Sequence, residues 1–294
     1  MKRLFVPAAL FAAVLASAGL TACTPGTRYV DLVFSSTTMS TATYKQTTDL
    51  TTGGPLALVT DVYQPAGDTF AKRPAIVWIH GGGFKGGDRS KFTDVAKAYA
   101  RRGYVTLSIE YRLDPGNRCQ AVQDGEIPPE QLAAETARCE RAITAAKHDA
   151  QSSVVWLRTK ATTYKVDPTR IAVGGGSAGA ITALNVGQQS NPDGGAVPAN
   201  LRVGAVLAMS GCQYDLTSID RNDAPVAMLA SGGDQAVPYS CSVATVDAAR
   251  AAGTPVSTMY YPHESAHAQQ LYKDHQAAVD KSWTSFLITQ LRLP

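Results

Sequence analysis

Apolar runs alternate with helical spacings along most of the chain. Continuous or alternating apolar stretches predict strands, and apolar residues three and four positions apart predict helices. The expected strands span residues 56–65, 74–80, 104–112, 170–179 (where an apolar strand meets a glycine turn), 203–211, 224–233 and 255–261. The expected helices contain residues 92–100, 143–157 and 279–287. This alternation predicts an α/β fold, with a mainly parallel sheet and helices on both of its faces.

The first 22 residues form a separate segment. Lys2 and Arg3 precede an alanine-rich apolar run without acidic residues, which is typical of a secretory signal. The run ends in "LTAC", Leu20 to Cys23, which resembles the bacterial lipobox, whose cysteine is lipidated. We therefore expect export to the bacterial cell envelope and a lipid anchor to the membrane at Cys23. Cleavage after Ala18, which would leave Cys23 a plain thiol, is the alternative.

Two further segments differ from the main pattern. Residues 23–55 are rich in Ser and Thr and predict either a flexible tether or edge strands before a main domain at 56–294. Residues 113–140 are polar and stand where a short connection would suffice. A long insertion of this kind is expected to be a lid over a substrate site, with remote decoration as the alternative.

The charge and the cysteine content of the chain indicate which partners and which compartment to expect. The 294 residues carry a formal net charge of +3 without any basic run, so no nucleic-acid partner is expected. Of five cysteines, lipidation of Cys23 would leave four, enough for two disulfides in an oxidising compartment. Three pairings are possible. We favour Cys119–Cys139 and Cys212–Cys241, because each closes a short local loop.

A candidate nucleophile lies in "GGGSAG". Gly175 to Gly179 match G-x-S-x-G after an apolar strand and before an alanine-rich helical stretch. A sharp turn there needs small neighbours and would lift the Ser177 hydroxyl clear of the sheet. A glycine-rich turn without catalytic function is the alternative.

A second glycine-rich motif, "HGGGF", follows the strand at 74–80. Consecutive glycines let main-chain amides point at one spot, as an oxyanion hole requires. The expected donors are the amides of Gly82 and Gly83, together with that of Ala178. A phosphate-binding loop is disfavoured because no Walker lysine and serine follow. His80 is expected to fix the loop and not to act as the base.

With both motifs, residues 56–292 resemble the α/β-hydrolase fold esterases, in particular the hormone-sensitive-lipase-like and related small carboxylesterases. The resemblance implies hydrolysis of carboxylic esters without a cofactor, with catalytic residues in the order Ser, acid, His. Ser177 matches the nucleophile. "SGGDQAVP" matches the acid loop at Asp234. Two features depart from the pattern of these esterases. Gly176 stands where an acidic residue or histidine usually precedes the serine, and the insertion at 113–140 is atypical. The fallback acids are Asp215, Asp220 and Asp223.

The stretch "HESAHA" allows two chemistries. As H-E-x-x-H, residues 263–267 would be a zinc-peptidase motif, but that motif needs a helix, and here Pro262 and a polar turn follow a strand. A third ligand at the matching spacing is also missing, since Lys273 stands there. The resembled esterases place their base at the head of the last helix. His267 is therefore preferred to His263 as the base, and no metal is expected.

The expected function is that of a serine carboxylic-ester hydrolase that forms an acyl-enzyme through Ser177, His267 and Asp234. An amidase or peptidase on the same fold, a zinc peptidase and a non-catalytic binding domain are the alternatives. The expected substrate is a small-molecule or polysaccharide ester. Acyl length, alcohol and oligomeric state stay open.

Overall fold

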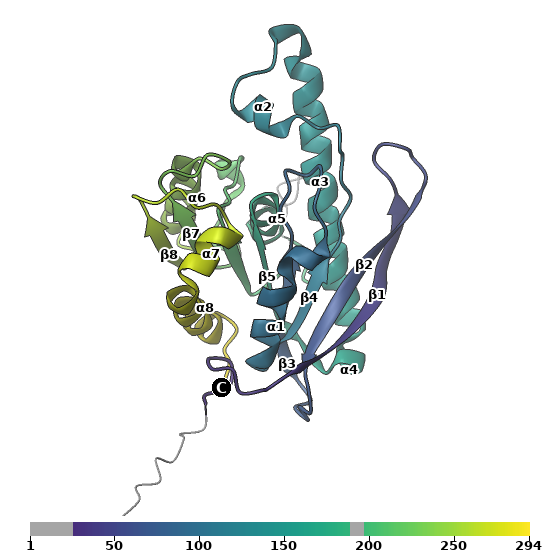
Figure 1. Cartoon of the computed structure of the whole chain (residues 1–294), viewed down its shortest axis with the longest axis vertical. Coiled ribbons are helices and arrows are strands. Elements are labelled where there is room, and N and C mark those ends of the chain that lie inside the picture. Colours follow the sequence, from purple (N-terminus) through teal and green to yellow (C-terminus); the bar gives the residue numbers. More distant parts are fainter. Residues whose placement is uncertain (1–25, 189–196) are drawn as a thin grey trace, which may run out of the picture.

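The computed structural model describes residues 26–188 and 197–294. The predicted signal segment and Cys23 lie outside the described residues. Within these ranges the strands form one eight-stranded sheet in the order β1-β2-β4-β3-β5-β6-β7-β8 (Figure 1). The strands are β1 (Thr37–Thr48), β2 (Pro55–Pro65), β3 (Arg73–Ile79), β4 (Val105–Ile109), β5 (Val166–Gly176), β6 (Ala205–Met209), β7 (Val226–Ser231) and β8 (Val256–Tyr261). The pairs β1–β2 and β2–β4 are antiparallel and the other pairs are parallel, which confirms the predicted fold class.

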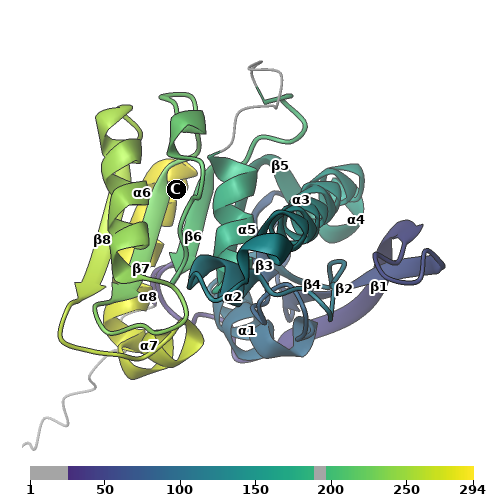
Figure 2. The same ribbon diagram turned by 90° about the horizontal axis from the view of Figure 1, so that it is seen from above.

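The apolar runs that predicted strands form the centre of the sheet. Every residue of β3, β4, β6 and β7 is buried, because helices cover both faces of the sheet. In Figure 2, α3, α5 and α6 lie on one face, and α1, α7 and α8 lie on the other. The helices are α1 (Thr93–Arg101), α2 (Cys119–Gln123), α3 (Pro129–Thr159), α4 (Ala161–Tyr164), α5 (Ala178–Gly187), α6 (Tyr239–Ala251), α7 (Gln269–Asp274) and α8 (Gln276–Gln290), with 3₁₀ turns η1 (Arg89–Phe92) and η2 (Leu216–Ser218). None of these helices is long and apolar enough to cross a membrane within the described residues.

The Ser/Thr-rich segment is an edge strand over much of its length. β1 pairs with β2 along its whole length, and Tyr44 of β1 is buried and donates to the Glu110 carbonyl at 2.5 Å. The turn of this hairpin is organised by Asp49, whose carboxylate accepts from the amides of Thr51 and Thr52. Threonine is polar, as in a flexible tether, but it is also β-branched and suits a half-exposed strand. A threonine-rich composition therefore could not distinguish a tether from a strand here.

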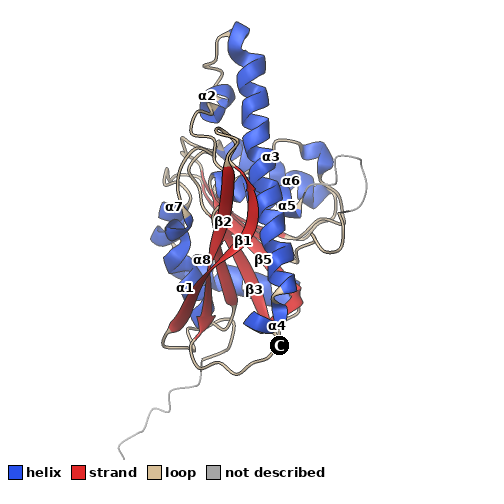
Figure 3. Ribbon diagram, turned by 90° about the vertical axis from the view of Figure 1, so that its right-hand side faces the viewer, coloured by secondary structure: helices blue, strands red, loops and turns tan. Residues whose placement is uncertain are grey.

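The predicted insertion ends in a helix that continues into the core. We expected residues 113–140 to be separate from a helix beginning near residue 143. In the structure α3 is one helix of 31 residues that begins at Pro129, about 46 Å long at 1.5 Å per residue. Its first turns project beyond the sheet together with α2 (Figure 3). The sequence pattern did not reveal these first turns of α3, because they are largely exposed and carry no apolar stripe that would indicate a helix.

Both predicted disulfides are present. Cys119 and Cys139 join α2 to α3 with their Cα atoms 5.2 Å apart. Cys212 and Cys241 join the loop after β6 to α6 with their Cα atoms 5.4 Å apart. Each bond therefore ties a helix to a segment that follows a strand at the carboxyl edge of the sheet, where ligands of open α/β sheets bind.

Candidate active site

Ser177 occupies a sharp turn between β5 and α5. Its backbone is in a strained positive-φ conformation, with φ 57° and ψ −127°. The flanking glycines are required sterically. A Cβ on Gly175 would lie 2.4 Å from the carbonyl of Gly179, and one on Gly179 would lie 2.0 Å from the Ile79 oxygen. The Ser177 amide donates to Met209 at 2.9 Å, which fixes the turn against β6. The G-x-S-x-G stretch thus has the strand–turn–helix context that its pattern predicts.

Asp234 and His267 form a hydrogen-bonded pair at the same edge of the sheet. Asp234 follows β7, and His267 lies between β8 and α7. The His267 Nδ1 atom is 2.7 Å from Oδ2 and 2.9 Å from Oδ1 of Asp234. The Asp234 side chain is 2% exposed and that of His267 is 32% exposed. The carboxylate is therefore shielded, while the imidazole reaches the surface of the site.

Two serine hydroxyls hold the backbone on either side of His267. Ser210, after β6, accepts from the amide of Ala268 at 2.9 Å, and Ser231, at the end of β7, donates to the carbonyl of Ala266 at 2.6 Å. The Ser210 hydroxyl is also hydrogen-bonded to Asp234. The sequence analysis missed both serines. Their one available signal was their place at the end of an apolar strand.

The Ser177 turn packs against the segment that carries His267. A Cβ on Gly176 would lie 3.2 Å from the Ala268 Cβ and 2.8 Å from the Gln269 Oε1. Glycine before the nucleophile, which departs from the resembled esterases, thus suits the close approach of Ala268 and Gln269, which a side chain there would have to displace. Among the described residues the Ser177 hydroxyl has no hydrogen bond to His267. Such bonds often tighten only when substrate is bound.

The glycine loop after β3 lies beside Ser177. A Cβ on Gly81 would lie 3.0 Å from the Ser177 Cβ. Gly82 and Gly83 have φ values of 120° and 63°, and a Cβ on Gly82 would lie 2.0 Å from the Gly86 oxygen. Ala178 opens α5, where the first amides have no partner within the helix. The three predicted oxyanion donors therefore belong to segments that adjoin the serine.

His80 is buried beneath this loop. Its Nδ1 lies 2.8 Å from the Gly81 oxygen, and its ring stacks on Tyr111 with centroids 4.4 Å apart. The Tyr111 hydroxyl donates to the His80 carbonyl at 2.9 Å. These contacts agree with the loop-fixing role expected for His80.

The zinc-motif residues lie in a turn and coil, so His263 and His267 do not share a helical face. His263 is exposed. Glu264 instead pairs with His275 at 2.8 Å, and the His275 ring stacks on Tyr261 with centroids 3.7 Å apart. His275, which directly precedes α8, thus joins this turn to the start of that helix.

The fallback acids are each bonded within their own turn. Asp215 accepts from the Thr217 amide at 3.0 Å, and the Asp223 carboxylate accepts from the Asp220 amide at 2.7 Å. Burial raises the pKa of Asp223 to about 6. Of the candidate acids, Asp234 is the one that contacts His267.

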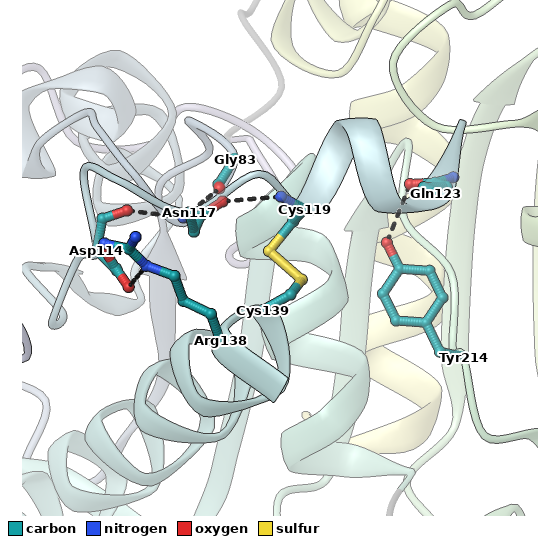
Figure 4. Close-up of a disulfide and its surroundings, with 8 residues drawn as sticks. All are labelled: Gly83, Asp114, Asn117, Cys119, Gln123, Arg138, Cys139 and Tyr214. Carbon is teal, nitrogen blue, oxygen red and sulfur yellow. Dashed lines mark hydrogen bonds and ion pairs between the residues drawn. A yellow bond between two sulfur atoms is a disulfide. The ribbon is translucent and has the colours of Figure 1, made fainter. Parts of the chain in front are cut away.

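A cavity of about 310 Å³ opens in front of Ser177. The body of the protein supplies a largely apolar wall, which includes Phe84, Ala178, Ile181, Ala236 and Val237. The insertion supplies a mainly polar wall, which includes Asn117, Arg118, Gln120, Gln123 and Glu126. The Tyr214 hydroxyl donates to Gln123 at 3.4 Å and so joins the two sides (Figure 4). The insertion thus lines the same cavity as Ser177, as expected of a lid.

The Asp234 carboxylate contributes pH-dependent stability. Burial alone would raise its pKa, but hydrogen bonds from His267, the Val237 amide, Ser210 and the Ala236 amide outweigh burial and lower it. The stabilisation is therefore present above the unfolded-state pKa and is lost as the pH falls through the lower folded-state pKa. We expect Asp234→Asn to lower the free energy of unfolding by about 1–3 kcal/mol at neutral pH. Urea unfolding at pH 7 and at acid pH measures this difference, and an equal loss at both would contradict it.

Comparison with known proteins agrees with this architecture. The chain matches the BD-FAE family over residues 60–125 and 136–213. Among solved structures, esterase 2 of Thermogutta terrifontis phosphorylated by paraoxon superposes with a TM-score of 0.64 at 18% identity, covering 85% of this chain and 94% of that one. The propionate-bound form of that esterase gives a TM-score of 0.64 at 17% identity, covering 86% and 94%. None of the curated proteins matches. The α/β-hydrolase part of the expected resemblance is confirmed: the chain has the α/β-hydrolase fold and is similar to the BD-FAE family over the matched residues.

Proposed function

We propose that this protein hydrolyses carboxylic esters through an acyl-enzyme, with Ser177 as nucleophile, His267 as general base and Asp234 as the group that orients the imidazole. The observation that carries the proposal is the Asp234–His267 pair at 2.7 Å, carried on a segment whose next residue, Ala268, closely approaches the strained Ser177 turn at the carboxyl edge of the sheet. A shielded carboxylate, an accessible imidazole and a hydroxyl lifted on a sharp turn are the components of acyl transfer.

The geometry supports a proton path through His267. Because Nδ1 of His267 faces Asp234, Nδ1 carries a proton and Nε2 is left to accept one from Ser177. Ser177 Oγ then attacks the ester carbonyl carbon, and the carbonyl electrons move to oxygen. When the tetrahedral intermediate collapses, the carbon–oxygen bond to the alcohol breaks and protonated His267 gives its proton to the alcohol. Water repeats the sequence on the acyl-enzyme and restores the Ser177 hydroxyl.

Main-chain amides would stabilise the charge on oxygen in each intermediate. Gly82 and Gly83 lie in a loop beside Ser177, and Ala178 is the first residue of α5. One donor of this kind is worth about 2.7–4 kcal/mol of transition-state stabilisation. The positive end of the α5 dipole favours the same negative charge.

The cavity supports a substrate with a small acyl group and a polar alcohol. A volume of about 310 Å³ is at the lower end for ligand pockets, and its apolar wall adjoins Ser177. The polar wall formed by the insertion suits hydroxyl groups, as in an ester of a polyol or a polysaccharide. Solved forms of the Thermogutta esterase hold propionate and butyrate, which are small acids.

We also propose that the protein acts outside the cytoplasm, anchored at Cys23. The lipobox-like "LTAC" and the preceding apolar run support this location. Two disulfides suit an oxidising compartment.

Organophosphate labelling combined with an ester panel tests the activity. We expect turnover of p-nitrophenyl esters from acetate to butyrate to exceed that of palmitate. Paraoxon should abolish turnover and leave one adduct on the tryptic peptide 171–202, assigned to Ser177 by fragmentation. Activity that resisted paraoxon but fell with a chelator would contradict the proposal and favour the zinc alternative.

A further inference from the structure

The glycine loop is held from outside by the insertion. The Asn117 side-chain amide donates to the Gly83 carbonyl at 3.2 Å, and the main-chain amide of Asp114 donates to the Phe84 carbonyl at 2.9 Å. Asn117 also donates to the Asp114 carbonyl at 2.9 Å, so the two contacts are joined. Two consecutive carbonyls of the loop are thus bound by one short stretch of the insertion. Figure 4 shows the contact of Asn117 with Gly83.

That stretch is in turn held by two consecutive residues of α3. Arg138 binds the Asp114 carboxylate through Nε at 2.6 Å and Nη2 at 2.5 Å. The Asn117 Oδ1 accepts from the Cys119 amide at 3.1 Å, and Cys119 is bonded to Cys139. We call Asp114, Asn117, Cys119, Arg138 and Cys139 the clamp. It connects a rigid helix to the loop through one ion pair and one covalent bond.

The loop needs an external restraint because of its backbone. Gly83 and Phe84 both have positive φ, at 63° and 62°. For a phenylalanine this conformation is costly and persists only where the surroundings enforce it. Binding the Gly83 and Phe84 carbonyls restricts ψ of Gly83 and φ of Phe84. The Gly83 amide belongs to the preceding peptide plane, between Gly82 and Gly83, which shares the Gly83 Cα atom with the plane that Asn117 holds.

The clamp is itself firm enough to act as a restraint. The Asn117 residue is 4% exposed and Phe84 is 2% exposed, so water competes little for their contacts. The Arg138 hydrogen bond holds the pKa of the Asp114 carboxyl below its usual value, so the ion pair is formed at neutral pH. Charge-assisted bidentate bonds of this type are stronger than neutral ones and fix orientation.

We propose that the clamp positions the oxyanion loop, and that Asn117 and Arg138 are positioning residues for ester hydrolysis. The inference rests on the proposed function for its effect on catalysis. It gives the insertion a second task beyond lining the cavity. If the insertion only shaped the cavity, loss of the Asn117 contact would change KM. If it positions the oxyanion donors, the loss falls on kcat, because the charge develops only in the transition state.

The matched variants are Asn117→Asp, Arg138→Gln and Glu130→Gln. Aspartate keeps the acceptor for the Cys119 amide but cannot donate to Gly83. We expect Asn117→Asp to lower kcat by about 10- to 100-fold with KM nearly unchanged, since small misplacements of catalytic groups cost this much. Arg138→Gln, at a partly exposed side chain, should give a smaller fall in kcat without unfolding. Glu130→Gln, on the exposed first turn of α3, is the control and should match the wild type.

Hydrogen exchange over residues 80–86 gives a readout that does not need activity. Exchange should be faster in Asn117→Asp, in Arg138→Gln and in the Cys119→Ser/Cys139→Ser double variant than in the wild type. Unchanged exchange, or an effect confined to KM, would overturn the clamp. If the wild type turned over no ester, the proposed function would fail, while the exchange measurement would still decide whether the clamp holds the loop.

Discussion

Ser177→Ala should lower kcat for ester hydrolysis by about 10⁴- to 10⁶-fold, the range seen when a triad nucleophile is removed. The variant removes the one hydroxyl positioned on the turn between β5 and α5. The fold should be unaffected, because the Ser177 side chain has no hydrogen bond among the described residues and alanine meets the same backbone strain at φ 57°. Steady-state kinetics with a p-nitrophenyl ester, together with thermal unfolding, measures both effects.

The control for this variant is Ser285→Ala. Ser285 is exposed on α8 and is not among the residues of the site, so its loss should leave kcat unchanged. Paraoxon should no longer label peptide 171–202 in Ser177→Ala. Turnover near the wild-type rate in Ser177→Ala would remove Ser177 from its role.

His267→Ala should lower kcat by about 10⁴-fold or more, while His263→Ala should leave it close to the wild type. The two histidines belong to the same H-E-x-x-H sequence but differ in environment. His267 is bonded to a shielded Asp234, whereas His263 is exposed on the turn. The pair of variants therefore compares the base with a neighbour of the same chemistry, measured on one ester under identical conditions.

The same pair separates the two mechanisms. In a zinc site both histidines would be ligands, so both variants would lose activity and both would lose metal. In the serine mechanism Ser177→Ala and His267→Ala act on one proton transfer, so their double variant should be little worse than either one alone. Equal losses in His263→Ala and His267→Ala would refute the assignment of the base.

The central strands could be predicted from the sequence because a continuous apolar run indicates a strand that is buried on both faces. β3, β4, β6 and β7 are buried at every position, and their continuous apolar runs require helices on both faces. Ser177 was also readable, since the glycines around it are imposed by local sterics at one turn. The disulfide pairs followed from short loops, because residues near in sequence are near in space.

The hydrogen bond between Asp234 and His267 could not be predicted from the local sequence pattern. Their positions followed from family resemblance, but their contact at 2.7 Å depends on how β7 and β8 end beside each other. Ser210 reaches both the Asp234 carboxylate and the Ala268 amide across two strand ends. A serine at the end of an apolar strand has no sequence signal that distinguishes this role.

By itself the sequence determined the alternating fold, the nucleophile turn and the glycine loop, because each depends on burial or geometry over a few neighbouring residues. It favoured the cysteine pairs that the structure contains. Only the tertiary structure decided that Ser- and Thr-rich residues 37–48 are an edge strand and that α3 continues back to Pro129. It also decided that Asn117 reaches the glycine loop and that Arg138 binds Asp114. These segments are largely polar and exposed, so their order comes from hydrogen bonds and ion pairs to distant partners, which leave no periodic pattern along the chain.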